Sequence, residues 1–210
     1  MIPSSLPTVF LVDDDASVRR ALARLIKSAG HQVQTFTSAR EFLDTSADAE
    51  EAACLVLDVR MPGLTGIDLQ RELQTMNRNL PIVFITGHGD IPMSVKAMKA
   101  GAVDFLPKPV NDTDLLRAIE RAIARACRDR AERIKIEDIQ RRVEQLTPRE
   151  REVMALVASG MPNKLIASEL GTVEKTIKVH RARVMEKMEV GSLAELVRLA
   201  GHVGIPRKKV

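Results

Sequence analysis

Five short apolar runs recur along the first 125 residues, separated by stretches of mixed polarity. The runs are VFLV (9–12), VQTF (33–36), CLVLD (54–58), PIVFIT (81–86) and VDFL (103–106). Uninterrupted runs such as CLVL and IVFI are typical of strands buried on both faces, and the stretches between runs have the length of helical crossovers. The pattern predicts a doubly wound α/β domain at residues 1–125, with a five-stranded parallel sheet.

Turn-forming residues lie where this fold needs them. Asp15 is placed to cap a helix from Ala16 to Ala29, and Gly30 follows that helix. Met61-Pro62-Gly63 follows the third run, and Ala100-Gly101 ends the helix before the fifth. The alternation of strand and helix is therefore supported by the residues between them.

The stretch from 111 to 145 contains neither Gly nor Pro. Asn111 or Asp112 is a suitable N-cap, so the stretch predicts one long helix that continues into a helical linker at 126–144. Apolar residues within it are spaced 3, 4 and 3, at Ile136, Ile139, Val143 and Leu146. This spacing fits either a coiled-coil dimer seam or a simple amphipathic helix.

Residues 145–210 predict an all-α domain of four helices. Thr147, Pro148 and Glu150 form a capping-box pattern that opens a helix through Ala158. The other expected helices are 163–170, ended by Gly171, a basic helix through Met188 capped by Thr172, and a helix from Ser192 to about Ala200. The second and third read as scaffold helix, turn and recognition helix, which is a helix-turn-helix.

Composition and charge narrow the class of protein. Hydrophobic residues make up 45% and charged residues 29% of the chain, as in soluble globular proteins. No run approaches the length of a membrane span and no signal peptide opens the chain, so we expect a cytoplasmic protein without membrane contact. Cys54 and Cys127 lie far apart without metal-ligand spacing, which predicts structural roles.

The charge is unevenly distributed. Residues 1–125 hold 14 basic and 16 acidic side chains, whereas residues 145–210 hold 12 and 7. A polyanion is therefore attracted to the C-terminal domain rather than to the N-terminal one.

Polar residues cluster at the predicted carboxyl ends of the strands. Asp13 and Asp14 follow the first strand and Asp58 ends the third, while Thr86 ends the fourth and Lys108 lies just beyond the fifth. Ligands of open parallel sheets bind at this edge. Three crowded carboxylates repel one another without a cation, and their hard oxygen atoms suit Mg²⁺.

At these positions LVDDD, LDVRMPG, FITGHGD and FLPKP resemble the receiver domain of two-component response regulators. The resemblance implies that Asp58 is the nucleophile that takes a phosphoryl group from a phosphohistidine. It also implies that Asp14, Asp58 and the backbone carbonyl of Arg60 bind Mg²⁺ directly, and that Asp13 binds it through water.

The same resemblance assigns the remaining pocket residues. Lys108 neutralises phosphoryl charge and precedes Pro109 with a cis peptide bond. Thr86 donates its hydroxyl to the phosphoryl group, and Phe105 occupies the aromatic switch position. Enzymatic turnover is not expected beyond self-phosphorylation from the donor and slow autodephosphorylation.

The predicted recognition helix is basic over an apolar spine of Ile177, Val184 and Met188. Residues suited to phosphates and base edges are Lys175, Thr176, Lys178, His180, Arg181 and Arg183. The segment from 144 to about 200 resembles the LuxR-type DNA-binding domain, and the whole chain resembles the NarL/FixJ group, with FixJ-like members most similar. That resemblance places Lys178 and Val179 at base edges, and Lys175, Thr176, His180 and Arg183 near phosphates. Ala182 departs from members with a basic residue there, so base preference does not carry over.

The family implies a sensor histidine kinase and duplex promoter DNA as partners, with RNA polymerase a further candidate, and a homodimer formed on phosphorylation through residues 91–105. Two rival functions stay open on sequence alone. One is a Mg²⁺-dependent phosphatase that uses Asp58 on small phosphates. The other keeps the receiver but gives it an RNA-binding or protein-docking tail. Stacking aromatics for RNA are scarce, because the chain has no Trp or Tyr and only 5 Phe.

Overall fold

Two compact units make up the chain, residues 1–129 and residues 130–210. The computed structural model describes residues 8–45, 52–87 and 91–202. Within those ranges no helix has both the length and the apolar character needed to cross a membrane.

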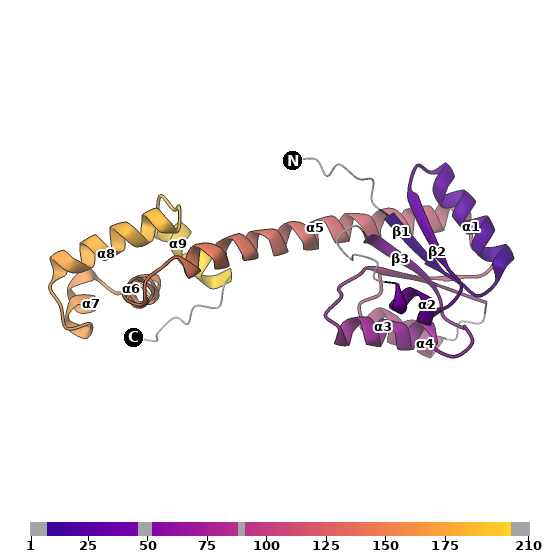
Figure 1. Ribbon diagram of the computed structural model, residues 1–210, viewed down its shortest axis with the longest axis horizontal. Coiled ribbons are helices and arrows are strands. Elements are labelled where there is room, and N and C mark those ends of the chain that lie inside the picture. The colour runs from indigo at the N-terminus through magenta and orange to yellow at the C-terminus, as the bar shows by residue number, and fades with distance from the viewer. Residues whose placement is uncertain (1–7, 46–51, 88–90, 203–210) are drawn as a thin grey trace. The chain divides into compact units, whose positions relative to one another are not determined.

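The first unit contains a five-stranded parallel sheet in the order β2-β1-β3-β4-β5 (Figure 1). The strands are β1 (Thr8–Val12), β2 (Gln32–Phe36), β3 (Ala52–Asp58), β4 (Ile82–Thr86) and β5 (Asp104–Pro107). The predicted doubly wound sheet is confirmed, with each strand on its apolar run.

Successive side chains of the central strands point to opposite faces of the sheet, and both faces are buried. On β1, Val9 and Leu11 pack in one core, whereas Phe10 and Val12 pack in the other. Figure 1 shows how the helices cover these faces, with α1 and α5 on one and α2, α3 and α4 on the other. Burial on both sides explains why these strands read as uninterrupted apolar runs.

The helices of the first unit are α1 (Ala16–Ser28), α2 (Ala39–Asp44), α3 (Gly66–Thr75), α4 (Ile91–Lys99) and the first part of α5 (Asp112–Glu144). Asp15 caps α1 as predicted, because its carboxylate accepts from the amides of Ser17 and Val18. Asn111 rather than Asp112 caps α5, since its side-chain oxygen accepts from the amides of Thr113 and Asp114.

The long helix α5 contributes to the cores of both units. Leu115 and Ile119 pack against the sheet, and Ile139 packs in the core of the second unit. Leu146 is also buried there and Val143 is partly buried. The apolar spacing at the end of α5 is therefore used within the chain, which favours the amphipathic helix over the dimer seam.

The second unit is all-helical, with α6 (Pro148–Ala158), α7 (Asn163–Glu169), α8 (Glu174–Lys187) and α9 (Leu193–His202) after the end of α5. The capping box of Thr147 and Glu150 forms as predicted. The prediction that Thr172 caps the basic helix is wrong, because Val173 is the N-cap residue and no side chain caps α8. Thr172 instead donates its amide to the carbonyl of Ala167 and so closes α7.

The two cysteines differ in their surroundings. Cys54 lies in the sheet core, and burial raises the pKa of its thiol to about 12, which suits a structural role. Cys127 is exposed on α5, so the expected structural role is not supported for it.

Candidate functional site

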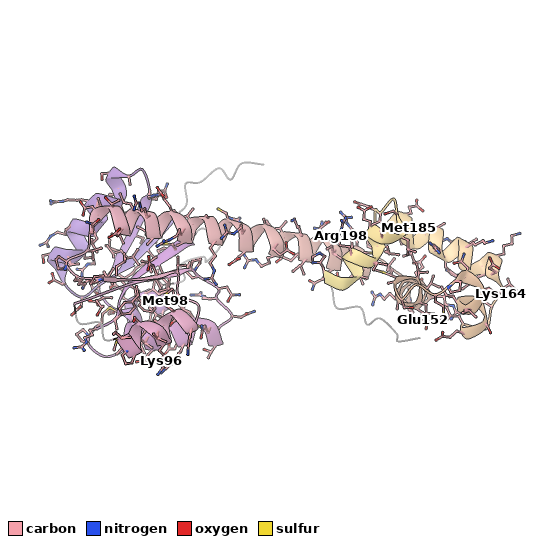
Figure 2. The ribbon with its side chains drawn as sticks, turned by 180° about the vertical axis from the view of Figure 1, so that it is seen from behind. Lys96, Met98, Glu152, Lys164, Met185 and Arg198 are labelled. Atoms are coloured by element: carbon pink, nitrogen blue, oxygen red, sulfur yellow. The ribbon has the colours of Figure 1, made fainter. Side chains whose placement is uncertain are left out.

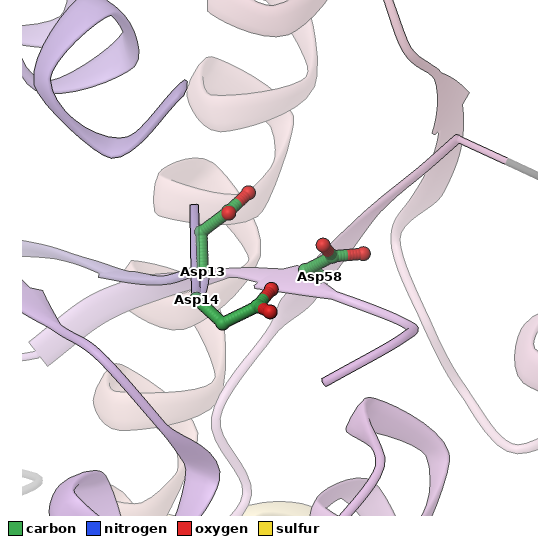
Figure 3. A group of neighbouring side chains, drawn as sticks. All are labelled: Asp13, Asp14 and Asp58. Atoms are coloured by element: carbon green, nitrogen blue, oxygen red, sulfur yellow. The ribbon is translucent and has the colours of Figure 1, made fainter. Parts of the chain in front are cut away.

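Three carboxylates meet at the carboxyl edge of the sheet. Asp13 and Asp14 follow β1 directly, and Asp58 is the last residue of β3 (Figure 3). One carboxylate oxygen from each lies within 4.8 Å of the others. Asp13 and Asp58 are buried, whereas Asp14 is exposed. Because β1 and β3 are neighbours, their ends bring residues 44 or 45 positions apart into one cluster.

Lys108 joins this cluster from the loop after β5. Its Nζ lies 2.8 Å from Asp13 Oδ2 and 2.6 Å from Asp58 Oδ2. Its backbone amide donates to the carbonyl of Thr86 at 2.7 Å, which ties the loop to the end of β4. The peptide bond between Lys108 and Pro109 is cis, as expected.

Burial and ion pairing oppose each other at this cluster. Burial raises the pKa of the Asp13 carboxyl, and the hydrogen bond and charge of Lys108 offset only part of that effect. At Lys108 burial acts to lower the pKa, but the hydrogen bonds to Asp13 and Asp58 outweigh it, so the pKa lies above its usual value. Lys108 therefore stays a cation between the two carboxylates.

The loop after β3 orients Asp58. The amide of Arg60 donates to Asp58 Oδ1 at 3.1 Å, and the amide of Gly66 donates to the carbonyl of Val59 at 3.0 Å. A Cβ atom on Gly66 would lie 2.2 Å from the backbone oxygen of Asp58, so only glycine allows α3 to approach this closely. Sequence reasoning missed Gly66, for which a glycine at the start of a helical stretch was the available signal.

The two expected switch residues lie on adjacent strands beside the cluster. Thr86 ends β4, is buried, and stands opposite Pro107 of β5. Phe105 is half-buried on β5, with its ring centroid 6.1 Å from that of Phe84. The rest of the expected TGHGD motif, residues 88–90, lies outside the described residues.

The cluster fits a hard divalent cation. Its donors are all carboxylate oxygens, and the exposed carboxylate of Asp14 opens the group to solvent. Arg60, whose backbone carbonyl the family resemblance makes a further oxygen donor, follows Asp58 by two residues and is exposed. Three carboxylates and the Lys108 ammonium carry a net charge of −2, which one Mg²⁺ neutralises.

A second surface lies on α8 in the C-terminal unit. The predicted apolar spine is confirmed, because Ile177, Val184 and Met188 are buried. The opposite side exposes a group of basic and apolar side chains, namely Lys175, Lys178, Val179 and Arg183. Thr176, His180 and Arg181 are half-buried beside them. In Figure 2, α8 is found by the label of Met185, which packs against the core, and the preceding helix α7 by the label of Lys164.

Several of these side chains have partners within the unit. Lys178 pairs with Glu174 one turn earlier at 3.1 Å, and Arg181 donates to Asn163 Oδ1 at 3.3 Å. His180 Nδ1 is buried without a hydrogen-bond partner in the part of the chain that the structure describes. Lys175 and Arg183 are exposed on α8.

Comparison with protein families assigns both units. Residues 9–120 match the family described as response regulator receiver domain. Residues 144–200 match the bacterial regulatory proteins of the luxR family.

Similar proteins share both regions in the same order. Nodulation protein W of Bradyrhizobium diazoefficiens is 49% identical over 96% of this chain and 88% of its own length. Transcriptional regulatory protein FixJ of Rhizobium meliloti is 45% identical over 92% of this chain and 94% of its own. Among solved structures, response regulator StyR matches with a TM-score of 0.82 at 49% identity, over 94% of this chain and 99% of that one. Full-length FixJ from B. japonicum matches with a TM-score of 0.57 at 46% identity, over 95% and 98%.

Proposed function

The chain belongs to the two-component response regulators that join a receiver domain to a LuxR-type DNA-binding domain, and from this premise we propose which residues carry its function. It is a transcriptional regulator of the FixJ type rather than a member of an enzyme family. Asp58 accepts the phosphoryl group, and α8 reads duplex DNA. The observation that carries the first assignment is the contact of the Asp58 carboxylate with Lys108 at 2.6 Å inside an acidic cluster.

Phosphoryl transfer requires one oxygen of Asp58 as nucleophile. That oxygen forms a bond to phosphorus as the bond from phosphorus to a histidine nitrogen of the sensor kinase breaks, and the nitrogen keeps the electron pair. The product is an acyl phosphate on Asp58. Slow attack by water then releases inorganic phosphate and restores the carboxylate, which is the only turnover we propose.

Asp13, Asp14, Asp58 and the carbonyl of Arg60 are the proposed Mg²⁺ ligands. The bound cation supplies charge neutralisation for the phosphoryl oxygens. Lys108 already faces Asp58 and supplies a second positive charge from the loop after β5, at the same edge of the sheet. Asp13, deeply buried, keeps Lys108 in place through its own ion pair at 2.8 Å.

The conformational change then spreads from the phosphorylated pocket through the ends of β4 and β5. Thr86 donates its hydroxyl to a phosphoryl oxygen, and Phe105 moves inward behind it. The contact of the Lys108 amide with the Thr86 carbonyl supports a concerted shift, because it links the two strand ends. Phosphorylation biases this two-state element.

We place the homodimer surface on α4 and β5. Ile91, Val95 and Met98 are spaced 4 and 3 along α4 and are 80%, 45% and 43% exposed. Lys96 and Met98 mark this helix in Figure 2. An exposed apolar stripe of this kind is typical of an interaction surface. Two linked DNA-binding units gain effective concentration on paired half-sites, and contact with RNA polymerase completes the proposed output.

The phosphoacceptor is tested by labelling with radioactive acetyl phosphate in the presence of Mg²⁺. We expect Asp58→Asn to abolish incorporation of acid-labile phosphate. Asp15→Asn is the matched control, because Asp15 lies near the cluster but serves as the cap of α1, a role that asparagine also fills. Stoichiometric label on Asp58→Asn would move the nucleophile to another residue.

The DNA-reading helix is tested with a duplex enriched from a random-sequence pool by the wild-type protein. We expect Lys178→Ala to weaken binding by about 1–3 kcal/mol, the usual cost of a lost base contact. Lys27→Ala removes the same charge from an exposed position on α1 of the receiver and serves as the control. If Lys178→Ala leaves the affinity and its salt dependence unchanged, α8 is not the recognition helix.

A further inference from the structure

The C-terminal end of α8 is tied to the end of α5 by one arginine. Arg142 Nη1 donates to the carbonyl of Met188, the C-cap residue of α8, at 3.0 Å. Arg142 Nη2 lies 2.6 Å from Asp138 Oδ2 on its own helix and 3.1 Å from Glu189 Oε2 beyond α8. A planar guanidinium is suited to hold several oxygens in fixed directions. Arg142 therefore connects α5 to the end of α8 through the Met188 carbonyl and the Glu189 carboxylate, while Asp138 holds the guanidinium from its own helix.

A second tie starts from the last residue of α8. Lys187 Nζ lies 2.7 Å from Glu150 Oε2 and 3.2 Å from the carbonyl of Gln145, just after α5. Glu150 is buried, and the same carboxylate oxygen accepts from the amide of Thr147 in the capping box of α6. The hydrogen bonds from Lys187 and Thr147 hold the pKa of Glu150 at about 2. The carboxylate is thus ionised wherever the domain functions, and the tie persists.

Buried apolar side chains pack at the same end of α8 as the contacts of Arg142 and Lys187. Ile139 of α5 and Met188 and Val184 of α8 belong to one buried core. Charged contacts and packing thus fix the same end of α8, whereas no side chain caps its other end.

The fixed end lies about ten residues from the reading residues. At 1.5 Å per residue, a tilt of α8 by about 10° around Met188 would move Lys178 by about 2.5 Å. Hydrogen bonds to base edges tolerate only a few tenths of an ångström. A small loosening at the Met188 end therefore removes base contacts at the other.

We propose that Arg142 and Lys187 are positioning residues for DNA recognition, which hold α8 at the angle from which its exposed face reads bases. This inference rests on the proposed role of α8 as the recognition helix. Arg142 does not itself contact DNA, because its guanidinium is engaged by three protein oxygens. Its effect reaches DNA through the orientation of α8.

The chain offers a matched control at the neighbouring position. Arg141 lies on the same turn of α5 and carries the same charge, but its side chain is 70% exposed, against 24% for Arg142. Its ion pair is with Asp138 of its own helix at 3.2 Å. Arg142→Met and Arg141→Met thus remove equal charge, and only the first breaks the tie to α8.

The experiment measures full-length variants on the selected duplex and on a scrambled duplex of equal length. Circular dichroism first identifies a temperature at which every variant is folded. We expect Arg142→Met to lose about tenfold in affinity for the selected duplex and less than about threefold for the scrambled one, with an unchanged salt slope. Lys187→Met behaves similarly, Arg142→Lys recovers part of the loss, and Arg141→Met resembles wild type.

Each other outcome overturns the inference. Equal behaviour of Arg142→Met and Arg141→Met, with wild type binding the selected duplex, would mean that the tie does not position α8, and the proposed function would stand. A salt slope reduced by about one, with equal losses on both duplexes, would identify Arg142 as a phosphate contact. If the wild type enriches no duplex at all, the proposed function fails, and the inference fails with it.

Discussion

Lys108 lies between two buried carboxylates, and burial disfavours a charged group that has no partner. The ammonium group contacts Asp13 and Asp58, while Asp14 faces solvent. A buried charge is tolerated when it is paired, and removal of one partner leaves the other uncompensated. The ion pairs thus stabilise the resting protein, and the proposed phosphoryl transfer uses the same residues, because both need a cation at this place.

Glu150 gives the C-terminal unit a specific dependence on pH. Its pKa falls from 4.5 to about 2, so the ionised form stabilises the fold above pH 4.5, and that stability is lost as the pH falls toward 2. We expect Glu150→Gln to lower the free energy of unfolding at pH 7 by about 1.5–3 kcal/mol, the range for charge-assisted hydrogen bonds. The free energy of unfolding of the Glu150→Gln variant should then vary less between pH 4.5 and 2 than that of wild type.

Urea unfolding at pH 7, 4.5 and 3 measures this effect. Glu152→Gln is the control, since Glu152 is exposed and pairs with Arg149 at the surface. Identical pH profiles for Glu150→Gln and wild type would show that the tie to Lys187 contributes nothing.

Some site residues follow from the sequence and others do not. Asp13, Asp14 and Asp58 were predictable as a cluster, because parallel strands bring their carboxyl ends to one edge. The tie of Arg142 to the carbonyl of Met188 was not, because the partners are 46 residues apart and a backbone oxygen leaves no sequence signal.

Among the elements, α8 begins without a side-chain cap. Val173 occupies the N-cap position and is 64% exposed, so its side chain neither accepts a hydrogen bond from the first amides of α8 nor packs in the core. The first amides of a helix need an acceptor from a side chain, water or a ligand.

Val173→Ser supplies that acceptor. We expect the C-terminal unit to gain about 1 kcal/mol of stability, which corresponds to a rise of a few degrees in melting temperature. Thermal unfolding followed by circular dichroism measures the change. Val173→Ala, which removes the same apolar surface without adding an acceptor, should not give the increase, and a gain of equal size in both variants would rule out capping as the cause.

Element prediction succeeded where burial dictates the pattern. The central strands have both faces covered, so their runs are apolar throughout, whereas the edge strand β2 is largely exposed. Asp15, Asn111 and Thr147 are capping residues that the local sequence identifies. A helical crossover was expected between the second and third runs, but α2 could not be bounded from the sequence, since it is only 6 residues long and buries two side chains. Thr172 was misassigned because α7 uses it for closure, which moves the start of α8 one residue on.

For the whole molecule, α5 is the element that both units share. Its first part packs on the sheet through Leu115 and Ile119, and its end enters the core of the DNA-binding unit through Ile139. Residues 126–144, predicted as a linker, therefore include part of the second core.

We propose that phosphate on Asp58 controls DNA binding by α8. The most direct measurement compares the affinity of wild type and Asp58→Asn for the selected duplex, each with and without phosphoramidate and Mg²⁺. We predict that phosphorylation raises wild-type affinity about tenfold, within the usual range of coupling between sites, and leaves Asp58→Asn unchanged. Equal wild-type affinity in both states, or an equal response of Asp58→Asn, would contradict the account.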